Sequence, residues 1–99
     1  MKKVYEIVRY KQKKDVMDQA ILKASKALQE IVKTQPGLIS RKLSKSDSGE
    51  WMDVVLWESI DHATQAAEVV NTHPVSGEFM KLVDETTMVF DHYEIIEAY

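Results

Sequence analysis

The sequence contains no cysteine, and it has only three glycines and two prolines. Without cysteine, a disulfide framework and thiol chemistry are both excluded. No stretch is apolar for long enough to cross a bilayer, and the first residues lack the apolar core of a signal peptide. A glycine-rich phosphate loop and a Gly-x-Ser-x-Gly nucleophile turn are also missing. These absences favour a cytoplasmic protein that works away from membranes.

The chain is long enough for one domain, residues 1–99, and too short for two. Its hydrophobic fraction of 44% is ordinary for a globular protein, so disorder is not expected. A domain of this size buries only about two-thirds of the surface that its unfolded chain exposes. We therefore expect the domain to gain stability by forming an oligomer.

Charge is unevenly distributed along the chain, although the net charge is only -3. Twelve of the thirteen Lys and Arg residues lie in residues 1–45, and twelve of the sixteen Asp and Glu residues follow them. A basic half can bind nucleic acid or a membrane, or it can pack against the acidic half of its own chain. The order of the secondary-structure elements decides between these interpretations.

Residues 51–57 are rich in β-branched and bulky side chains and predict a strand. Both of its faces are mostly apolar, so this strand is expected to be covered on both sides. Gly49 in the preceding turn can adopt a positive φ, and Ser59 is placed to cap a following helix.

Hydrophobic periodicity predicts the remaining elements. An amphipathic helix is expected to begin at a cap on Asp15 and to end at Gln35-Pro36-Gly37, where proline and glycine stop it. Strands are predicted over residues 4–12, 38–45 and 86–96, with a helix over residues 59–71 and a short helix from Pro74 that includes Val83.

This order of elements predicts an α+β, ferredoxin-like βαββαβ fold, with a four-stranded antiparallel sheet ordered fourth, first, third, second. The basic first and second strands then neighbour the acidic third and fourth strands, so internal charge pairing explains the distribution better than a nucleic-acid surface. RNA-recognition domains share this order but need aromatic residues on the exposed sheet face, where this chain offers Asp53 and Glu58. No nucleic-acid partner is therefore expected.

Three short motifs carry a resemblance to a known family. The first strand ends in Val8-Arg9-Tyr10, the first helix closes with Gln35-Pro36-Gly37-Leu38, and Leu56-Trp57-Glu58-Ser59 opens the second helix. In these motifs the chain resembles the antibiotic biosynthesis monooxygenase-like family, over nearly its whole length. The resemblance implies a homodimer in which two sheets pack face to face as a dimeric α+β barrel, with a pocket between the sheet and helices of each protomer. Family members include cofactor-independent oxygenases of hydroquinone-like or polycyclic phenols, haem-degrading enzymes, and proteins with no known reaction.

The composition of the strands supports the dimer independently. A lone ferredoxin-like domain leaves one face of its sheet in water, and that face should be polar. Here neither face is cleanly polar, so a second copy is expected to cover one of them.

Trp57 matches the family's tryptophan at the end of the third strand. In haem-degrading relatives, that tryptophan works with an asparagine on the first strand and a histidine on the second helix. Here Val8 and Arg9 stand at the first position, and Phe79 and Met80 at the second, which argues against haem degradation. Trp57 is either a catalytic residue or a packed core residue.

His62, His73 and His92 are the only histidines, and they lack the i, i+4 spacing of a metal-binding helix face, so no metal site is expected. His73 is a candidate base that takes a proton from a phenol, or else a cap residue in water. His62 is a candidate substrate-binding residue. Tyr10 and Tyr93 could orient a planar phenol through their hydroxyls, or could lie at the dimer interface.

Two functional hypotheses follow. The first is a cofactor-independent monooxygenase of a small aromatic or quinol-like substrate, with His73 and Trp57 as catalytic residues and Tyr10, Trp57, His62 and Tyr93 as substrate-binding residues. An electron-rich phenolate can itself reduce dioxygen, so the protein only has to desolvate and deprotonate it, and no cofactor is expected. The second is a dimeric protein that binds a small molecule without turnover.

Overall fold

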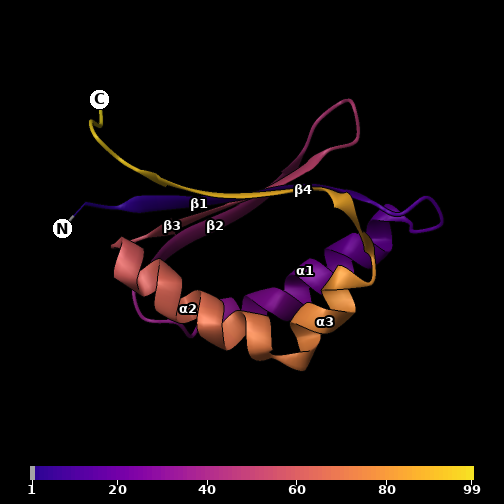
Figure 1. The fold of residues 1–99 in the computed structure, drawn as a ribbon, viewed down its shortest axis with the longest axis horizontal. Coiled ribbons are helices and arrows are strands. Elements are labelled where there is room, and N and C mark those ends of the chain that lie inside the picture. Colours follow the sequence, from indigo (N-terminus) through magenta and orange to yellow (C-terminus); the bar gives the residue numbers. More distant parts are fainter. Residues whose placement is uncertain (1) are drawn as a thin grey trace.

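All three helices lie on one face of a four-stranded antiparallel sheet in the computed structural model, which describes residues 2–99 (Figure 1). The α+β ferredoxin-like fold predicted from the sequence is confirmed. Among the described residues, no helix combines the length and apolar character that crossing a membrane requires. The elements are β1 (Val4–Gln12), α1 (Asp18–Val32), β2 (Leu38–Lys45), β3 (Trp51–Trp57), α2 (Ile60–Thr72), α3 (Pro74–Met80) and β4 (Val83–Glu94).

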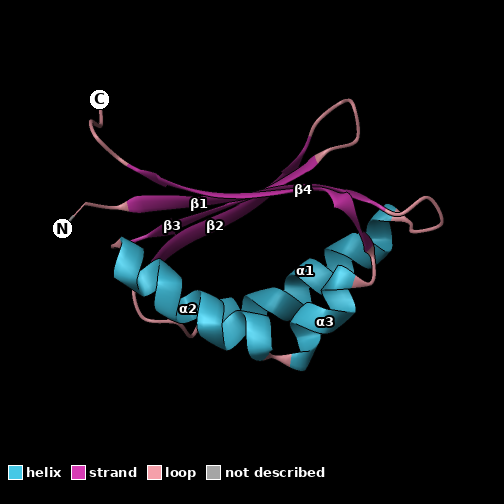
Figure 2. Cartoon of the chain, in the orientation of Figure 1, coloured by secondary structure: helices cyan, strands magenta, loops and turns pink. Residues whose placement is uncertain are grey.

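The sheet has the strand order β2-β3-β1-β4, as predicted (Figure 2). Opposite charges meet across its strands. Arg41 Nη2 of β2 lies 2.6 Å from Asp53 Oδ2 of β3, and Arg9 Nη1 of β1 lies 3.7 Å from Glu50 Oε1 beside the start of β3. These pairs support internal charge complementarity as the reason for the uneven charge distribution.

The two helix caps predicted from the sequence have different outcomes. Ser59 caps α2, because its hydroxyl accepts the backbone N–H of His62 at 3.2 Å. The cap predicted at Asp15 is wrong: α1 begins three residues later, and no side chain caps it. Instead the Gln12 side chain stabilises the loop between β1 and α1, donating to the Val16 carbonyl at 2.9 Å and to the Asp18 carboxylate at 2.8 Å.

The last strand begins at Val83 rather than at residue 86, and α3 ends at Met80. Val83 is fully buried and pairs with Gln12, so its contacts with β1 decide its conformation. The pairing of β1 with β4 is irregular beyond this point, where the Lys11 backbone N–H donates to the Thr87 hydroxyl at 2.9 Å. A single strand with an irregular start therefore replaces the predicted end of the short helix.

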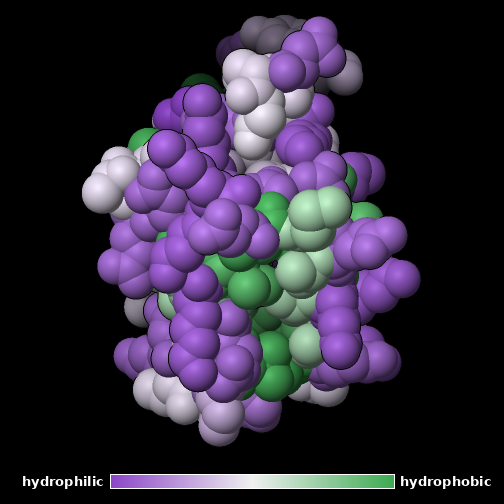
Figure 3. Space-filling model, turned by 90° about the vertical axis from the view of Figure 1, so that its right-hand side faces the viewer, coloured by the Kyte–Doolittle hydropathy of each residue, from purple (hydrophilic) through white to green (hydrophobic). Residues whose placement is uncertain are grey.

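The core lies between the sheet and the helices. Trp51, Val55 and Trp57 of β3 are buried there, alternating with residues that point to the other face of the sheet. At the end of the molecule nearest α3, a strip of hydrophobic side chains shows at the surface between hydrophilic ones (Figure 3). The buried hydrophobic residues are Val4, Tyr10, Ile21, Leu28, Val32, Trp51, Val55, Trp57, Ala63, Ala66, Phe79 and Val83.

The face of the sheet opposite the helices carries no helix or strand from residues 2–99 (Figure 1). The pairing of β1 with β3 and β4 places Ile7 beside Val54, and Tyr5 between Leu56 and Tyr93, on this face. The face is therefore apolar at its centre. Its hydrophobic side chains are Tyr5, Ile7, Met52, Val54, Leu56, Val89 and Tyr93.

Gly37 and Gly49 have positive φ angles of 85° and 89° and form a matched pair for a stability test. A Cβ at residue 49 meets nothing within 4 Å, so Gly49→Ala should cost only the backbone term of about 1–2 kcal/mol. Gly37→Ala should lose about 1–3 kcal/mol more than Gly49→Ala, because a Cβ at residue 37 would overlap the ring of His62. Urea denaturation at equal protein concentration measures both losses, and equal losses would contradict the expected clash.

Candidate functional site

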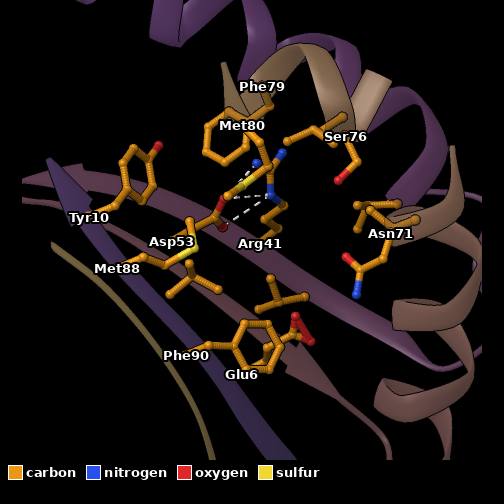
Figure 4. A pocket seen from close by; sticks show the side chains of 15 residues that line it. Glu6, Tyr10, Arg41, Asp53, Asn71, Ser76, Phe79, Met80, Met88 and Phe90 are labelled. Carbon is orange, nitrogen blue, oxygen red and sulfur yellow. Dashed lines mark hydrogen bonds and ion pairs between the residues drawn. The ribbon is translucent and has the colours of Figure 1, made fainter. Parts of the chain in front are cut away.

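A cavity of about 150 Å³ lies between the sheet and the helices. Strands β1 to β4 and helices α1 to α3 all contribute to it, and most of its lining is apolar (Figure 4). Five polar side chains point toward this apolar space: Glu6, Arg41, Asp53, Asn71 and Ser76. The remaining members of the lining are apolar or aromatic: Val8, Tyr10, Leu28, Val32, Val55, Val70, Phe79, Met80, Met88 and Phe90.

The cavity opens between the edge strand β4 and the corner where α2 meets α3. Phe90 of β4 and Asn71 near the end of α2 are its most exposed lining residues. Leu28 and Phe79, in contrast, are buried at its inner wall. A ligand would therefore enter beside Phe90 and lose its contact with water inside.

Arg41 and Asp53 form the most extensive polar contact in the lining (Figure 4). The guanidinium binds both carboxylate oxygens, with Nε 3.1 Å from Oδ1 and Nη2 2.6 Å from Oδ2. It also donates to the Ser25 carbonyl at 3.1 Å, to the Ser25 hydroxyl at 3.0 Å and to Gln29 Oε1 at 3.2 Å. The side chains of Arg41 and Asp53 are only 8% and 15% exposed. Each charge is thus neutralised by the other, and neither is free to bind a ligand.

Glu6 of β1 is the second carboxylate in the cavity. Its Oε2 accepts the indole N–H of Trp57 at 3.2 Å and lies 3.6 Å from His92 Nε2. Burial raises the pKa of the Glu6 carboxyl above its ordinary value of 4.5, while His92 and the Trp57 hydrogen bond lower it and Asp53 raises it further. The net upward shift makes this carboxylate a better proton acceptor than one in water.

Tyr10 of β1 is fully buried in the cavity wall. Burial raises the pKa of its phenol above the ordinary value of 10, with the charge of Asp53 adding to the shift and that of Arg41 opposing it. Its ring packs edge to face against Phe79, with 5.2 Å between the ring centroids. Tyr10 therefore stays a neutral phenol that shapes the cavity.

Of the site residues predicted from the sequence, Tyr10 alone lines the cavity. Trp57 lies behind the lining, buried in the core, and reaches the cavity only through its hydrogen bond to Glu6. Both interpretations of Trp57 therefore remain open, and its catalytic role stays a prediction.

The predicted histidines and Tyr93 lie outside the lining. His62 Nδ1 is 2.8 Å from the Ser59 hydroxyl, in the first turn of α2. His73 caps α3, and its Nδ1 accepts the Val75 backbone N–H at 3.2 Å, which leaves only Nε2 for other partners. Tyr93 is 54% exposed on the sheet face opposite the helices. The structure does not bring these three residues together, and their roles stay predictions.

The sequence analysis missed most of the polar lining. Asp53 was expected on the exposed face of the sheet, which is wrong: it lies on the helix side, in the cavity lining. Glu6 and Asp53 interrupt the apolar sets that alternate along β1 and β3 on that side, so a charged residue at a core position was a usable signal. Asn71 and Ser76 gave no such signal, because only the packing of α2 and α3 over the sheet brings them to the cavity. Among residues 2–99, no group of three or more His, Asp or Glu side chains is arranged to hold a metal ion.

No protein-family model and no curated protein matches the sequence. Solved structures, in contrast, match the fold over nearly the whole chain. The cofactor-independent oxygenase SnoaB from Streptomyces nogalater superposes with a TM-score of 0.84 and 12% identity, covering 99% of this chain and 97% of SnoaB.

Two candidate antibiotic biosynthesis monooxygenases show the same likeness. The protein from Nitrosomonas europaea has a TM-score of 0.79 and 14% identity, covering 95% of this chain and 90% of its own. The protein from Caulobacter crescentus CB15 has a TM-score of 0.76 and 14% identity, covering 97% and 92%. The chain thus has the fold of the antibiotic biosynthesis monooxygenase-like proteins, and the resemblance seen in the sequence is confirmed at the level of the fold.

The Arg41–Asp53 pair gives a stability prediction. Asp53→Leu alone should lower the free energy of unfolding by about 3–5 kcal/mol, because it leaves a buried guanidinium without its carboxylate. The double replacement Arg41→Met with Asp53→Leu should recover much of that loss, because it removes both charges and keeps the volume apolar. Urea denaturation of the two variants at one protein concentration tests this, and a double variant less stable than the single one would refute it.

Proposed function

We propose that this protein is a cofactor-independent monooxygenase of a small phenol or hydroquinone bound in the cavity between sheet and helices. The observation that carries the proposal is the cavity itself, an apolar space with a few inward-pointing polar groups and a carboxylate of raised pKa. The shared fold with SnoaB, a cofactor-independent oxygenase, adds support.

The size of the cavity narrows the class of substrate. An apolar protein cavity of roughly 150 Å³ is large enough for benzene. The cavity here has about the same volume, so one aromatic ring with small polar substituents fits it, whereas fused rings would extend through the mouth past Phe90. A single-ring hydroquinone is therefore the substrate class that we propose.

The reaction balances without a cofactor. A hydroquinone with a free ring C–H reacts with one dioxygen to give a hydroxyquinone and one water, so the substrate supplies all four electrons. One oxygen atom forms the new C–O bond, and the other leaves in water with two hydrogens from the substrate. The protein has to exclude bulk water and remove a hydroxyl proton, because the resulting phenolate is the species that reduces dioxygen.

The alternative is a binding protein without turnover. The specific observation in its favour is that Arg41 and Asp53 neutralise each other, which leaves the cavity few polar groups with free capacity. Such a site could hold a small aromatic ligand through apolar contacts alone.

We also propose that the protein is a homodimer whose second copy covers the open sheet face. Tyr5, Val89 and Tyr93 are more than one-third exposed on this face, beside the half-buried Ile7 and Val54. An apolar sheet face of this kind is unfavourable in water, and a second copy offers an apolar surface of the same shape.

The monooxygenase is tested by oxygen consumption with hydroquinone and methylhydroquinone, and by mass spectrometry of the product formed from isotopically labelled dioxygen. We expect one labelled oxygen atom in a hydroxyquinone. Val70→Phe, which fills the cavity, should lower kcat/KM about tenfold or more, because even 1.4 kcal/mol of lost binding gives that factor. Val69→Phe, on the exposed side of the same helix, is the control and should leave the rate unchanged. If neither hydroquinone supports oxygen uptake at any pH, the monooxygenase proposal is refuted and the alternative, a binding protein without turnover, is favoured.

The dimer is tested by sedimentation. Wild-type protein should sediment as a dimer at micromolar concentration, and Val54→Arg should produce a monomer, because a charge at the centre of the covered face would be buried without a partner. Val69→Arg on the outer side of α2 is the matched control and should stay dimeric. A well-folded wild-type monomer would rule out the proposed assembly.

A further inference from the structure

Glu6 is the one carboxylate of the cavity with an oxygen left over for a ligand. Both oxygens of Asp53 are bound by Arg41, at 3.1 Å and 2.6 Å. In Glu6, by contrast, Oε2 takes the Trp57 hydrogen bond and the approach of His92, while no hydrogen bond from residues 2–99 reaches Oε1. The Glu6 side chain lines the cavity beside Phe90 at its mouth (Figure 4).

The carboxylate of Glu6 is also held in place. Glu6 is the third residue of β1 and is paired with Val55 of β3 on one side and His92 of β4 on the other. The Trp57 indole N–H fixes Oε2 from β3, so that Oε1 is the oxygen that can turn toward a ligand. Trp57 thereby acts as a positioning residue for Glu6.

The electrostatic surroundings favour proton transfer to this group. The ionisable side chains that face it are His92 of β4 and the Asp53–Arg41 pair of β3 and β2, while the remaining lining is apolar or uncharged. Burial raises the pKa of the carboxyl, so a proton taken from a phenol is held more strongly than by a carboxylate in water. Tyr10 stays protonated in the same cavity and does not compete as a base.

We propose that Glu6 is the general base of the cavity, whose Oε1 binds the hydroxyl of a bound phenol and accepts its proton. The O–H bond of the phenol breaks, an O–H bond to Glu6 forms, and the electron pair stays on the phenolate oxygen. This inference rests on the proposed oxygenase and assigns the base to Glu6, which lines the cavity, rather than to His73, which does not.

The first experiment needs no turnover and compares phenol with toluene, which carries a methyl group of similar size in place of the hydroxyl. Calorimetry should show that wild-type protein binds phenol at least tenfold more tightly than toluene. This difference in affinity should increase as the pH rises and Glu6 loses its proton. Glu6→Gln should lose this pH-dependent advantage while binding toluene as before. Glu58→Gln, at an exposed position directly after β3, is the matched control and should behave as wild type.

The second experiment follows oxygen uptake with hydroquinone. Glu6→Gln should lower kcat by about a hundredfold or more and abolish the rise of kcat with pH, while KM changes far less. Trp57→Phe should lower kcat by a smaller factor and keep the pH dependence. A Glu6→Gln variant that retains the phenol preference, or full kcat, would overturn the assignment. If the wild type consumes no oxygen but its preference for phenol depends on Glu6, the proposed oxygenase activity is refuted, while the binding of the phenol hydroxyl by Glu6 is supported.

Discussion

The buried ion pair between Arg41 and Asp53 connects the sheet to the helix layer beside the cavity. It joins β2 to β3 and ties both strands to α1 through Ser25 and Gln29. Because the pair lies in the cavity lining, its charges also act on the ionisable groups there. Burial is the main cause of the raised pKa of both Tyr10 and Glu6; the charge of Asp53 adds to both shifts, and the charge of Arg41 opposes that of Tyr10. A structural contact thus determines which carboxylate of the cavity remains available for chemistry.

The sheet separates two kinds of apolar surface. On the helix side, three helices pack over the sheet and leave a cavity that a single aromatic ring can fill. On the other side, Ile7 and Val54 pair across β1 and β3, and no helix or strand of the described residues covers them. Dimerisation and ligand binding would therefore stabilise the protein in the same way, because each removes apolar surface from water.

Much of the fold could be predicted because its signals are local. The alternation along residues 51–57, the Ser59 cap and the positive φ of Gly37 and Gly49 all involve neighbours in sequence. The two errors had different causes. Near the start of α1, the Gln12 side chain binds Val16 and Asp18, a local arrangement that the periodicity did not indicate. At the start of β4, the long-range pairing with β1 buries Val83 and draws it into the strand. The candidate site was predicted less well, since Tyr10 was identified while Glu6, Asn71 and Ser76 were not.

The order of the elements, the strand order and the charge pairing of the strands could be predicted from the amino-acid sequence, because periodicity and charge act on every residue of a strand or helix at once. Which polar groups share the cavity, and which of them already have hydrogen-bond partners, depends instead on the three-dimensional packing. Hydrogen bonds such as those from Arg41 to Asp53 and from Trp57 to Glu6 join residues that are distant in sequence. Their geometry depends on how the helices pack over the sheet, and no local pattern encodes that packing.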